Sequence, residues 1–390
     1  MRLNSVKDIQ EGSILGKSIY LSDGTLLLGA GFRITKPIIS KLKSRGYSHI
    51  YVMEEGTEEI IPEDVISDEI RHQAKSELAK KVSELENKLK LKNMSLEKSK
   101  QLLEDGYLEK FTISFDLRQI VKEILNDIFS TDTTYMSTLM LKSDDSYFLD
   151  HAINTTVLAT LIGAKYRFPR KELANLALGT LLHDIGKIII AQINDSSSNK
   201  SPGTFYKEHP TFGYLLLSKS HELTPMETQI INQHHEYQDG TGFPIGLKGR
   251  NFPPTKSNQN NGKGYIFRLA EITCVANAYD NLLMNPLQEE QLTPEEALKI
   301  ILTNSMTLYN RDIVETLHKV IPIFPVGTRV KIDDIVDPSL MGCFGFVAKI
   351  NESIMNRPVI IITTDKRGNR IKPIMLDTSK LNRIELKLFI

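Results

Sequence analysis

The sequence predicts a mainly α-helical protein: an all-helical catalytic bundle, preceded by a small α+β module and followed by a small β module. Two observations predict this layout. Strand-like alternation is confined to the two ends of the chain, whereas helical patterns and every candidate ligand fill the region between them. We place the domain boundaries at 1–60, 61–130, 131–323 and 324–390, the second range being a helical connecting region.

The composition is typical of a globular protein with no strong overall charge. The chain has 390 residues, is 41% hydrophobic and 25% charged, and balances 48 Lys and Arg against 48 Asp and Glu. This length suits two or three domains, and the balanced charge predicts no nucleic acid polymer as a partner. Cys274 and Cys343 are the only cysteines, so a disulfide framework is excluded. We find no signal core and no long apolar run, and expect a cytoplasmic protein without membrane insertion.

The first module is predicted to begin with a β-hairpin and to continue with one helix. Strand-like residues 13–20 and 25–28 flank an Asp-Gly turn signal at 22–24. Thr35 is a candidate N-cap, and Gly46 ends the helix before a short apolar strand. The pattern is typical of a small α+β unit.

The connecting region is rich in Lys, Glu and Leu, which favours helix. Apolar residues recur every seven positions along one seam, but Lys92 and Ser99 interrupt the alternate seam. The uninterrupted seam consists of Val82, Leu89, Leu96 and Leu103. Two interpretations stay open: residues 70–105 form a helix that pairs two chains in a homodimer, or a solvated connecting helix that packs on its own domain.

Residues 131–320 are predicted to be consecutive helices joined by loops. An apolar helix that should be buried ends at His183 and Asp184. Three predicted helices share this design, at residues 173–182, 227–235 and 266–283. The polar stretch 251–264, rich in Asn, Pro and Gly, is interpreted as a mobile loop near the mouth of the site.

After Phe324 the helical period disappears. Short β-branched runs separated by Gly, Asp and Asn predict strands at 328–332, 343–350, 358–364 and 370–376. We expect these strands to form a small β module without catalytic residues.

Histidines crowd into the central region. Of nine, six lie between residues 151 and 235: His151, His183, His209, His221, His234 and His235. Four of these follow one another at intervals of 32, 26 and 25 residues, the length of a helix, a loop and a return in an antiparallel bundle. A single such histidine is more often structural, but the joint pattern favours metal ligation. Asp184 adds a carboxylate that can bridge two metals, as a two-metal phosphodiesterase site requires.

Several motifs in this region together resemble the HD-GYP family of the HD phosphohydrolase superfamily. They are His151, Leu182-His183-Asp184-Ile185-Gly186-Lys187, Glu208-His209-Pro210 with Gly213, and His234-His235-Glu236 followed by Asp239-Gly240 and Gly242. The resemblance spans about residues 130–320. Members of the family hydrolyse the bacterial messenger cyclic di-GMP on an all-helical domain with two or three metals, usually iron or manganese. It implies metal ligation by His151, His183, Asp184, His209, His234 and His235, with Asp184 as the bridge.

The resemblance also implies roles for neighbouring residues. Asp184 and Lys187 are the catalytic candidates, and Lys187 is expected to reach a substrate phosphate, where a dianionic transition state needs a donor. The alternative for Lys187 is a cation at a helix C-terminus. The glycines after the His pair are expected to exclude a Cβ because of positive backbone angles or close approach of substrate. The expected substrate-binding residues are Lys187, Gly240, Gly242, Phe243, Pro244 and Asp280, the last also supporting the loop.

The chain departs from the family pattern at four positions. Phe243 replaces a tyrosine, which keeps the ring and removes a hydroxyl. Asn277 replaces a carboxylate metal ligand and can coordinate only through its neutral carbonyl oxygen. Pro286 replaces a phosphate-binding arginine, and Tyr147 replaces a carboxylate of three-metal members. We therefore expect two divalent metal ions per chain, iron or manganese, with Asn277 as one metal ligand.

The leading functional hypothesis is a phosphodiesterase that opens cyclic di-GMP to linear pGpG, with further cleavage to GMP left open. Two alternatives remain. Asn277, Phe243 and the missing arginine also suit a cyclic di-GMP receptor with weak turnover. An HD phosphohydrolase acting on another cyclic dinucleotide would share every ligand.

Overall fold

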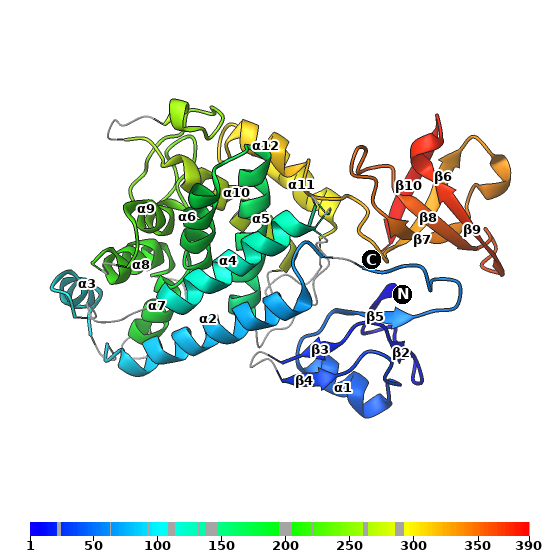
Figure 1. Ribbon diagram of the computed structural model, residues 1–390, viewed down its shortest axis with the longest axis horizontal. Helices are drawn as coiled ribbons and strands as arrows, with labels where there is room; N and C mark the ends of the chain where they lie inside the picture. The colour runs from blue at the N-terminus through cyan, green and yellow to red at the C-terminus, as the bar shows by residue number, and fades with distance from the viewer. Residues whose placement is uncertain are drawn as a thin grey trace.

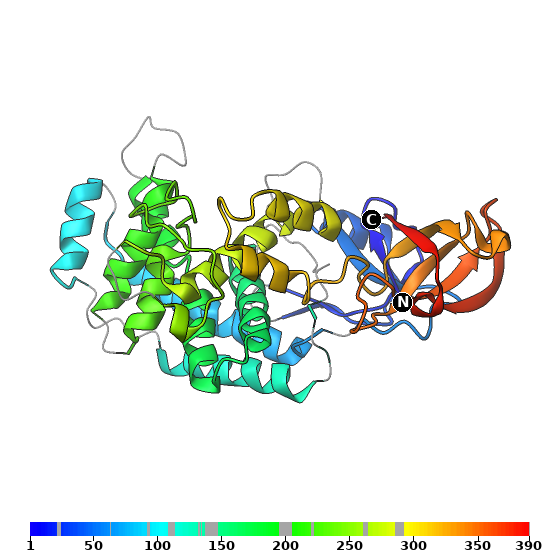
Figure 2. The same cartoon turned by 90° about the horizontal axis from the view of Figure 1, so that it is seen from above.

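The computed structural model describes residues 1–21, 25–62, 64–91, 94–107, 114–131, 133, 135–136, 147–194, 205–219, 222–259, 264–284 and 292–389. A helical body lies at one end, and two small β modules lie side by side at the other (Figure 1). The view from above shows the same division (Figure 2). The expectation of a helical protein with a β-rich C-terminal region is confirmed.

The N-terminal module contains two small antiparallel sheets and one helix. Its elements are β1 (Arg2–Ser5), β2 (Ile14–Leu15), β3 (Ile19–Tyr20), β4 (Leu26–Leu28), α1 (Lys36–Ser44) and β5 (His49–Met53). The prediction of one strand over 13–20 is wrong, because β2 pairs with β5 whereas β3 pairs with β4. The predicted turn at 22–24 lies outside the described residues. Thr35 is the N-cap residue of α1, as predicted, although its side chain makes no capping hydrogen bond.

The helical body buries one continuous apolar core. Its helices are α2 (Asp68–Lys88), α3 (Leu96–Glu104), α4 (Ser114–Ser130), α5 (Tyr147–Lys165), α6 (Arg170–Leu181), α7 (Gly186–Asn194), α8 (His209–Ser218), α9 (Pro225–Gln233), α10 (Arg268–Met284), α11 (Pro294–Thr303) and α12 (Arg311–Leu317). Helix α5 packs against both α6 and α10. Its residues from His151 to Gly163 are all buried, so it is covered on every side, as a central helix should be.

The stretch 70–105 of the connecting region is covered by two helices and not one. Helix α2 ends at Lys88 and α3 begins at Leu96, so the predicted single helix over 70–105 is wrong. Leu78, Leu85 and Leu103 are buried in the core of the same chain. Helix α2 runs beside α4 along one face of the body (Figure 1). The interpretation of packing on its own domain is therefore favoured, because leucines that are already buried are not free to contact a second chain.

The C-terminal module is one antiparallel sheet in the order β10-β6-β7-β8-β9. Its strands are β6 (Arg329–Ile335), β7 (Phe344–Lys349), β8 (Val359–Thr364), β9 (Arg370–Asp377) and β10 (Ile384–Phe389). The four predicted strands are present. The prediction missed β10, whose alternation of Ile, Leu and Phe with Glu and Lys was a usable signal.

The N-terminal module contacts both other parts of the chain. The amide of Leu3 donates to the carbonyl of Gly327 at 2.9 Å, which joins it to the C-terminal module. Arg370 on β9 pairs with Glu55 at 3.2 Å across the same junction. Lys17 pairs at 2.9 Å with Asp68, the first residue of α2. The N-terminal module is thus fixed to the start of the helix that runs along the helical body.

One described stretch, Arg170–Ile193, is long and apolar enough to cross a membrane by length and composition. Within the protein 83% of its most apolar window is buried. The stretch comprises α6, the turn with His183 and Asp184, and α7, so its apolar character is that of core helices around a polar site. Cys274 and Cys343 are both buried and free, as expected without a disulfide framework.

Two glycines let α7 and α8 approach at backbone distance. A Cβ on Gly186 would overlap the carbonyl oxygen of His209 and lie 2.7 Å from the amide nitrogen of Gly213. This approach brings the turn that holds Asp184 next to the first residue of α8. Glycine at 186 is therefore a packing requirement of the site.

We predict that Gly186→Ala lowers the free energy of unfolding of the metal-free protein by about 2 to 4 kcal/mol, because the added methyl group forces two backbones apart. Gly29→Ala is the matched control, since the nearest atom to its Cβ would be 3.9 Å away, and a change below about 1 kcal/mol is expected. Urea denaturation followed by circular dichroism measures both. Equal stability of the two variants would contradict the packing argument.

Candidate metal centre

The predicted ligands converge on the carboxylate of Asp184. Its Oδ2 lies 3.6 Å from His151 Nε2 and 3.4 Å from His183 Nε2. Its Oδ1 lies 3.2 Å from His209 Nε2 and 3.7 Å from His234 Nε2. Because the two oxygens face different pairs of histidines, the arrangement is that of a carboxylate that bridges two cations.

The histidines around Asp184 come from the end or the interior of different helices. Helix α6 ends just before the turn with His183 and Asp184, α8 begins at His209, and His234 is the C-cap residue of α9. A capping box at Thr224 fixes the start of α9. The sequence spacing therefore predicted the correct helix-by-helix arrangement.

Two overlapping groups of buried side chains could each hold a metal ion. In the described chain they are His151, His183 and Asp184, and Asp184, His209, His234 and His235. Within each group the ligand atoms all lie within 4.8 Å of one another. Imidazole nitrogens with a carboxylate oxygen suit iron, manganese or zinc. Asp184 belongs to both groups, as the bridging role requires.

Backbone carbonyls orient three of the histidines. Nδ1 of each lies within hydrogen-bond distance of the carbonyl oxygen three residues earlier: His183 with Thr180 at 2.7 Å, His209 with Tyr206 at 2.7 Å, and His234 with Ile231 at 2.8 Å. A hydrogen bond at Nδ1 fixes the ring and leaves Nε2 free for a metal. These three contacts explain why all three Nε2 atoms face Asp184.

Asp280 holds the fourth histidine. Its Oδ2 lies 2.6 Å from His151 Nδ1, and both side chains are buried. The structure shows Asp280 orienting a candidate metal-ligand histidine, a common partner arrangement in metal sites. The expectation that Asp280 supports the loop or binds substrate stays a prediction.

Four buried polar atoms at this point have no hydrogen-bond partner among the described residues. They are Nε2 of His151, His183 and His235, and Oδ1 of Asp184. Buried polar atoms almost always find a partner. Four at one place, all of them metal-ligating atoms, fit a site built for cations.

The protonation states also suit metal binding. Burial lowers the pKa of His183 and of His235 well below the usual range, and lowers that of His234 to about 4. Burial alone would raise the pKa of Asp184, but His183 and then Lys187 outweigh it and hold that pKa well below its usual range. Neutral imidazoles and an ionised carboxylate are the forms that bind metals.

Lys187 contacts the bridging carboxylate directly. Its Nζ donates to Asp184 Oδ2 and lies 5.4 Å from the ring centre of Tyr206. Burial would lower the pKa of Lys187, but Asp184 and Tyr206 raise it, so the side chain is cationic. Helix α7 begins at Gly186, which rules out the alternative of a cation at a helix C-terminus. Its side chain is 27% exposed, so the cation lies at the solvent edge of the cluster.

The loop after the His pair is organised by Glu236, which the sequence-based prediction did not single out. Its carboxylate accepts hydrogen bonds from the amides of Ile245 at 2.7 Å, Gly246 at 3.3 Å and Leu247 at 2.7 Å. The available signal was an acidic residue directly before a loop rich in Gly and Pro, where backbone amides lack partners.

Gly240 and Gly242 of this loop are required for different reasons. Gly240 has a φ of +85°, which confirms the predicted positive backbone angle. A Cβ on Gly242 would overlap the backbone of His235 and Tyr237. The chain itself, and not a substrate, therefore requires glycine at 242. The expectation of substrate contact at Gly240, Gly242 and Pro244 stays a prediction.

Phe243 supports His235, one of the candidate metal ligands. Its ring stacks on the imidazole of His235 with centroids 4.5 Å apart and planes at 19°. Its amide also donates to the carbonyl of His235 at 3.0 Å. The ring that replaces tyrosine in the motif thus fixes His235 through stacking alone.

Asn277 is engaged in a neutral hydrogen-bond chain. Its Oδ1 accepts from Asn281 Nδ2 at 2.7 Å, and Asn281 Oδ1 accepts from the hydroxyl of Tyr147 at 2.6 Å. One lone pair of the oxygen that would have to coordinate a metal is therefore used by Asn281, and the expectation that Asn277 is a ligand stays a prediction. Pro286 and His221 lie outside the described residues.

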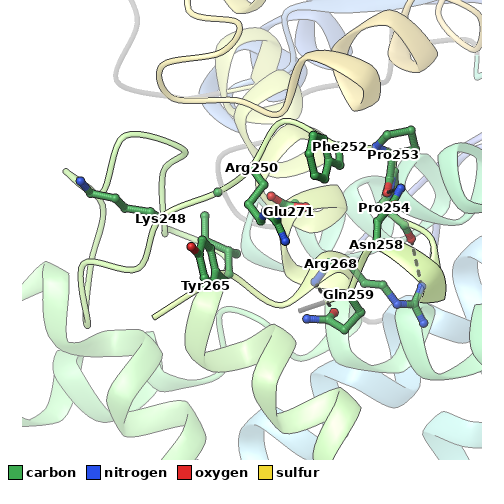
Figure 3. Close-up of a pocket in the computed structure, with 12 residues that line it drawn as sticks. Lys248, Arg250, Phe252, Pro253, Pro254, Asn258, Gln259, Tyr265, Arg268 and Glu271 are labelled. Carbon is green, nitrogen blue, oxygen red and sulfur yellow. Dashed lines mark hydrogen bonds between the residues drawn. The ribbon is translucent and has the colours of Figure 1, made fainter. Parts of the chain in front are cut away.

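The predicted mobile loop is anchored over its described part, residues 251–259. The amide of Asn251 donates to Gln238 Oε1 at 3.0 Å, and Asn310 Nδ2 donates to the carbonyl of Phe252 at 2.9 Å. This segment borders a small pocket in which Arg250 lies near Phe252 and Tyr265 (Figure 3). None of the metal-cluster residues lines that pocket in the described chain. The described part of the loop is thus held by hydrogen bonds, and its expected place near the mouth of the site stays a prediction.

Helix α2 reaches the helix that carries His151. Lys75 pairs with Asp150, the residue before His151, at 2.8 Å. Arg71 donates to Asn154 at 3.0 Å, one turn further along α5. Lys75 and Asn154 are buried, so these contacts are part of the packing that places α5.

Asp184→Ala is expected to remove bound metal from both positions, because each shares this carboxylate. Lys187→Ala should keep the metals, since its cation is not a ligand. Metal content after loading and dialysis, measured by inductively coupled plasma mass spectrometry, tests both. Retention of two metals by Asp184→Ala would show that the site assignment is wrong.

Asp280→Asn is expected to weaken one metal position about tenfold or more, because the partner that fixes the His151 ring loses its charge. The position held by His209, His234 and His235 should keep its affinity. Asp312→Asn is the control, as Asp312 accepts from Tyr166 and contacts no cluster residue in the described chain. Metal titration by calorimetry resolves the two positions, and equal weakening of both would contradict the assigned role.

Comparison with known proteins identifies the region that holds the cluster. Residues 136–257 match the family described as HD domain. A cyclic di-GMP phosphodiesterase of Pseudomonas aeruginosa is 24% identical over 221 residues, which cover 55% of this chain and 49% of that protein. A cyclic di-GMP phosphodiesterase of Thermotoga maritima is 28% identical over 229 residues, 58% of this chain and 55% of that protein. The chain spans about half the length of these relatives.

A solved structure described as a HDG"Y"P protein from Bdellovibrio bacteriovorus aligns with a TM-score of 0.44 at 18% identity, covering 81% of this chain and 97% of that one. The family match includes every residue of the metal cluster. The resemblance to HD phosphohydrolases drawn from the motifs is therefore confirmed to the extent that residues 136–257 of this chain match the HD domain family.

Proposed function

We propose that this chain is a metal-dependent phosphodiesterase that hydrolyses cyclic di-GMP to linear pGpG. The observation that carries the proposal is the buried carboxylate of Asp184 between two groups of histidines. Sequence relatives that bear the name cyclic di-GMP phosphodiesterase support the choice of substrate.

We propose two divalent metals per chain, iron or manganese. One would be held by His151, His183 and Asp184, the other by Asp184, His209, His234 and His235. When bound, such a pair lowers the pKa of water and neutralises charge on a phosphodiester. Two metals, and not three, agree with the neutral chain of Tyr147, Asn281 and Asn277, which offers no carboxylate.

The residues around the metals have separable tasks in this proposal. Lys187 lies at the solvent edge of the cluster, so its ammonium can donate to a phosphate oxygen as negative charge develops there. Asp280 and three backbone carbonyls hold the imidazoles in place. Both cysteines are free, which suits the cytoplasm as the proposed location.

A receptor with weak turnover is the second candidate. It is favoured by one observation, that the neutral amide of Asn277 accepts from Asn281 and offers no carboxylate at this position. In a receptor, restoring Asp at 277 and Arg at 286 should raise hydrolysis strongly from near zero while binding barely changes.

We predict that protein loaded with iron or manganese converts cyclic di-GMP to pGpG, as measured by liquid chromatography of the products. Lys187→Ala should lower kcat by about 100-fold or more while keeping metal, because a donor to the transition state is lost. A panel with other cyclic dinucleotides tests the third alternative. Absence of hydrolysis of every dinucleotide, in protein shown to hold two metals per chain, would sink the phosphodiesterase proposal.

A further inference from the structure

A second cavity adjoins the metal cluster on the side of α10. It has a volume of about 240 Å³, and His235 lines it as well as belonging to the cluster. Asn277, Ala278 and Leu282 of α10 form another part of its wall. A group bound in this cavity would therefore lie beside the phosphodiester site.

The wall of the cavity is neutral and partly aromatic. Tyr237 and Tyr309 line it with their rings perpendicular and 6.2 Å between centroids. No Lys, Arg, Asp or Glu is among the described lining residues. A cavity without cations does not suit a phosphate group. It suits an uncharged planar ring with polar edges.

Polar atoms for reading such a ring are available. In the described chain, the Tyr237 and Tyr309 hydroxyls make no protein hydrogen bond. The side-chain oxygen of Asn277 is engaged by Asn281, but no described bond engages its Nδ2. A base that stacks on a tyrosine ring could accept or donate at these groups, and stacking on aromatic rings is how proteins hold unpaired bases. Since sites for drug-sized ligands span about 300 to 1,000 Å³, this cavity suits one base and not a whole dinucleotide.

We propose that this cavity binds one nucleobase of the substrate while its phosphate lies at the metal cluster. Asn277, Tyr237 and Tyr309 are then specificity residues and not metal ligands. The inference rests on the proposed function for its placement of the phosphate, and it gives Asn277 a role that its hydrogen bond to Asn281 permits.

The test measures how much of the binding affinity comes from the base and how much from the sugar phosphate. Guanosine monophosphate and ribose 5-phosphate, which lacks the base, are titrated by calorimetry into metal-loaded protein. Tyr309→Leu removes an aromatic wall, and Ala278→Phe fills the cavity from α10. Tyr265→Leu is the matched control, since Tyr265 is 41% exposed and does not line this cavity. The wild type should bind guanosine monophosphate about tenfold more tightly than ribose 5-phosphate.

That preference should fall to about one in both cavity variants and persist in the control, with the affinity for ribose 5-phosphate unchanged throughout. Two results would overturn the inference: no preference in the wild type, or an equal loss of both ligands in the variants, which would mean that they act on the cluster through His235. Hydrolysis of cyclic di-GMP is scored separately. Its absence, with the base preference intact, would refute the proposed function and leave the cavity assignment standing.

Discussion

The buried carboxylate of Asp184 is the constraint around which the helical body is built. A charge in the protein interior is costly unless other groups compensate it. Here the ammonium of Lys187 compensates part of the charge, and metal ions held between the carboxylate and the imidazoles would compensate the rest, since each oxygen faces its own pair of histidines. The approach of α7 to α8 without side chains at Gly186 and Gly213 follows from this, because the turn that carries Asp184 has to reach His209.

The imidazole rings are held by hydrogen bonds at Nδ1 as well as by their packing around Asp184. Three Nδ1 atoms are fixed by backbone carbonyls three residues earlier in the chain, so no additional side chain is needed. His151 lies inside α5, where the helix itself engages the carbonyls, so its partner has to come from elsewhere and is Asp280 of α10. Helix α2 in turn braces α5 on either side of His151. The same α2 begins where Lys17 of the N-terminal module is bound, so the chain connects that module to a ligand-bearing helix through rigid secondary structure.

The role expected of Asn277 from the motif differs from the role that its surroundings suggest. Judged from the motif it is a weakened ligand; in the structure its oxygen is bound by Asn281 and it borders a neutral cavity. An amide cannot supply the charge that a metal position needs, but it can read the edge of a base. The same replacement is consistent with fewer metals and with a different use of this wall.

The sequence alone predicted the helical class, three apolar helices of the body to within a few residues and six candidate ligands that the structure brings together, because apolar periodicity and metal-ligating residue types are local properties of the chain. Tertiary structure decided the rest. Asp280 pairs with a histidine that lies 129 residues away in the sequence, Gly242 is required by the backbone of His235, and the heptad leucines of α2 face the core of their own chain. Strand β10 is read as an edge strand only once it lies beside β6. Each of these depends on which distant segments come into contact, which no local pattern specifies.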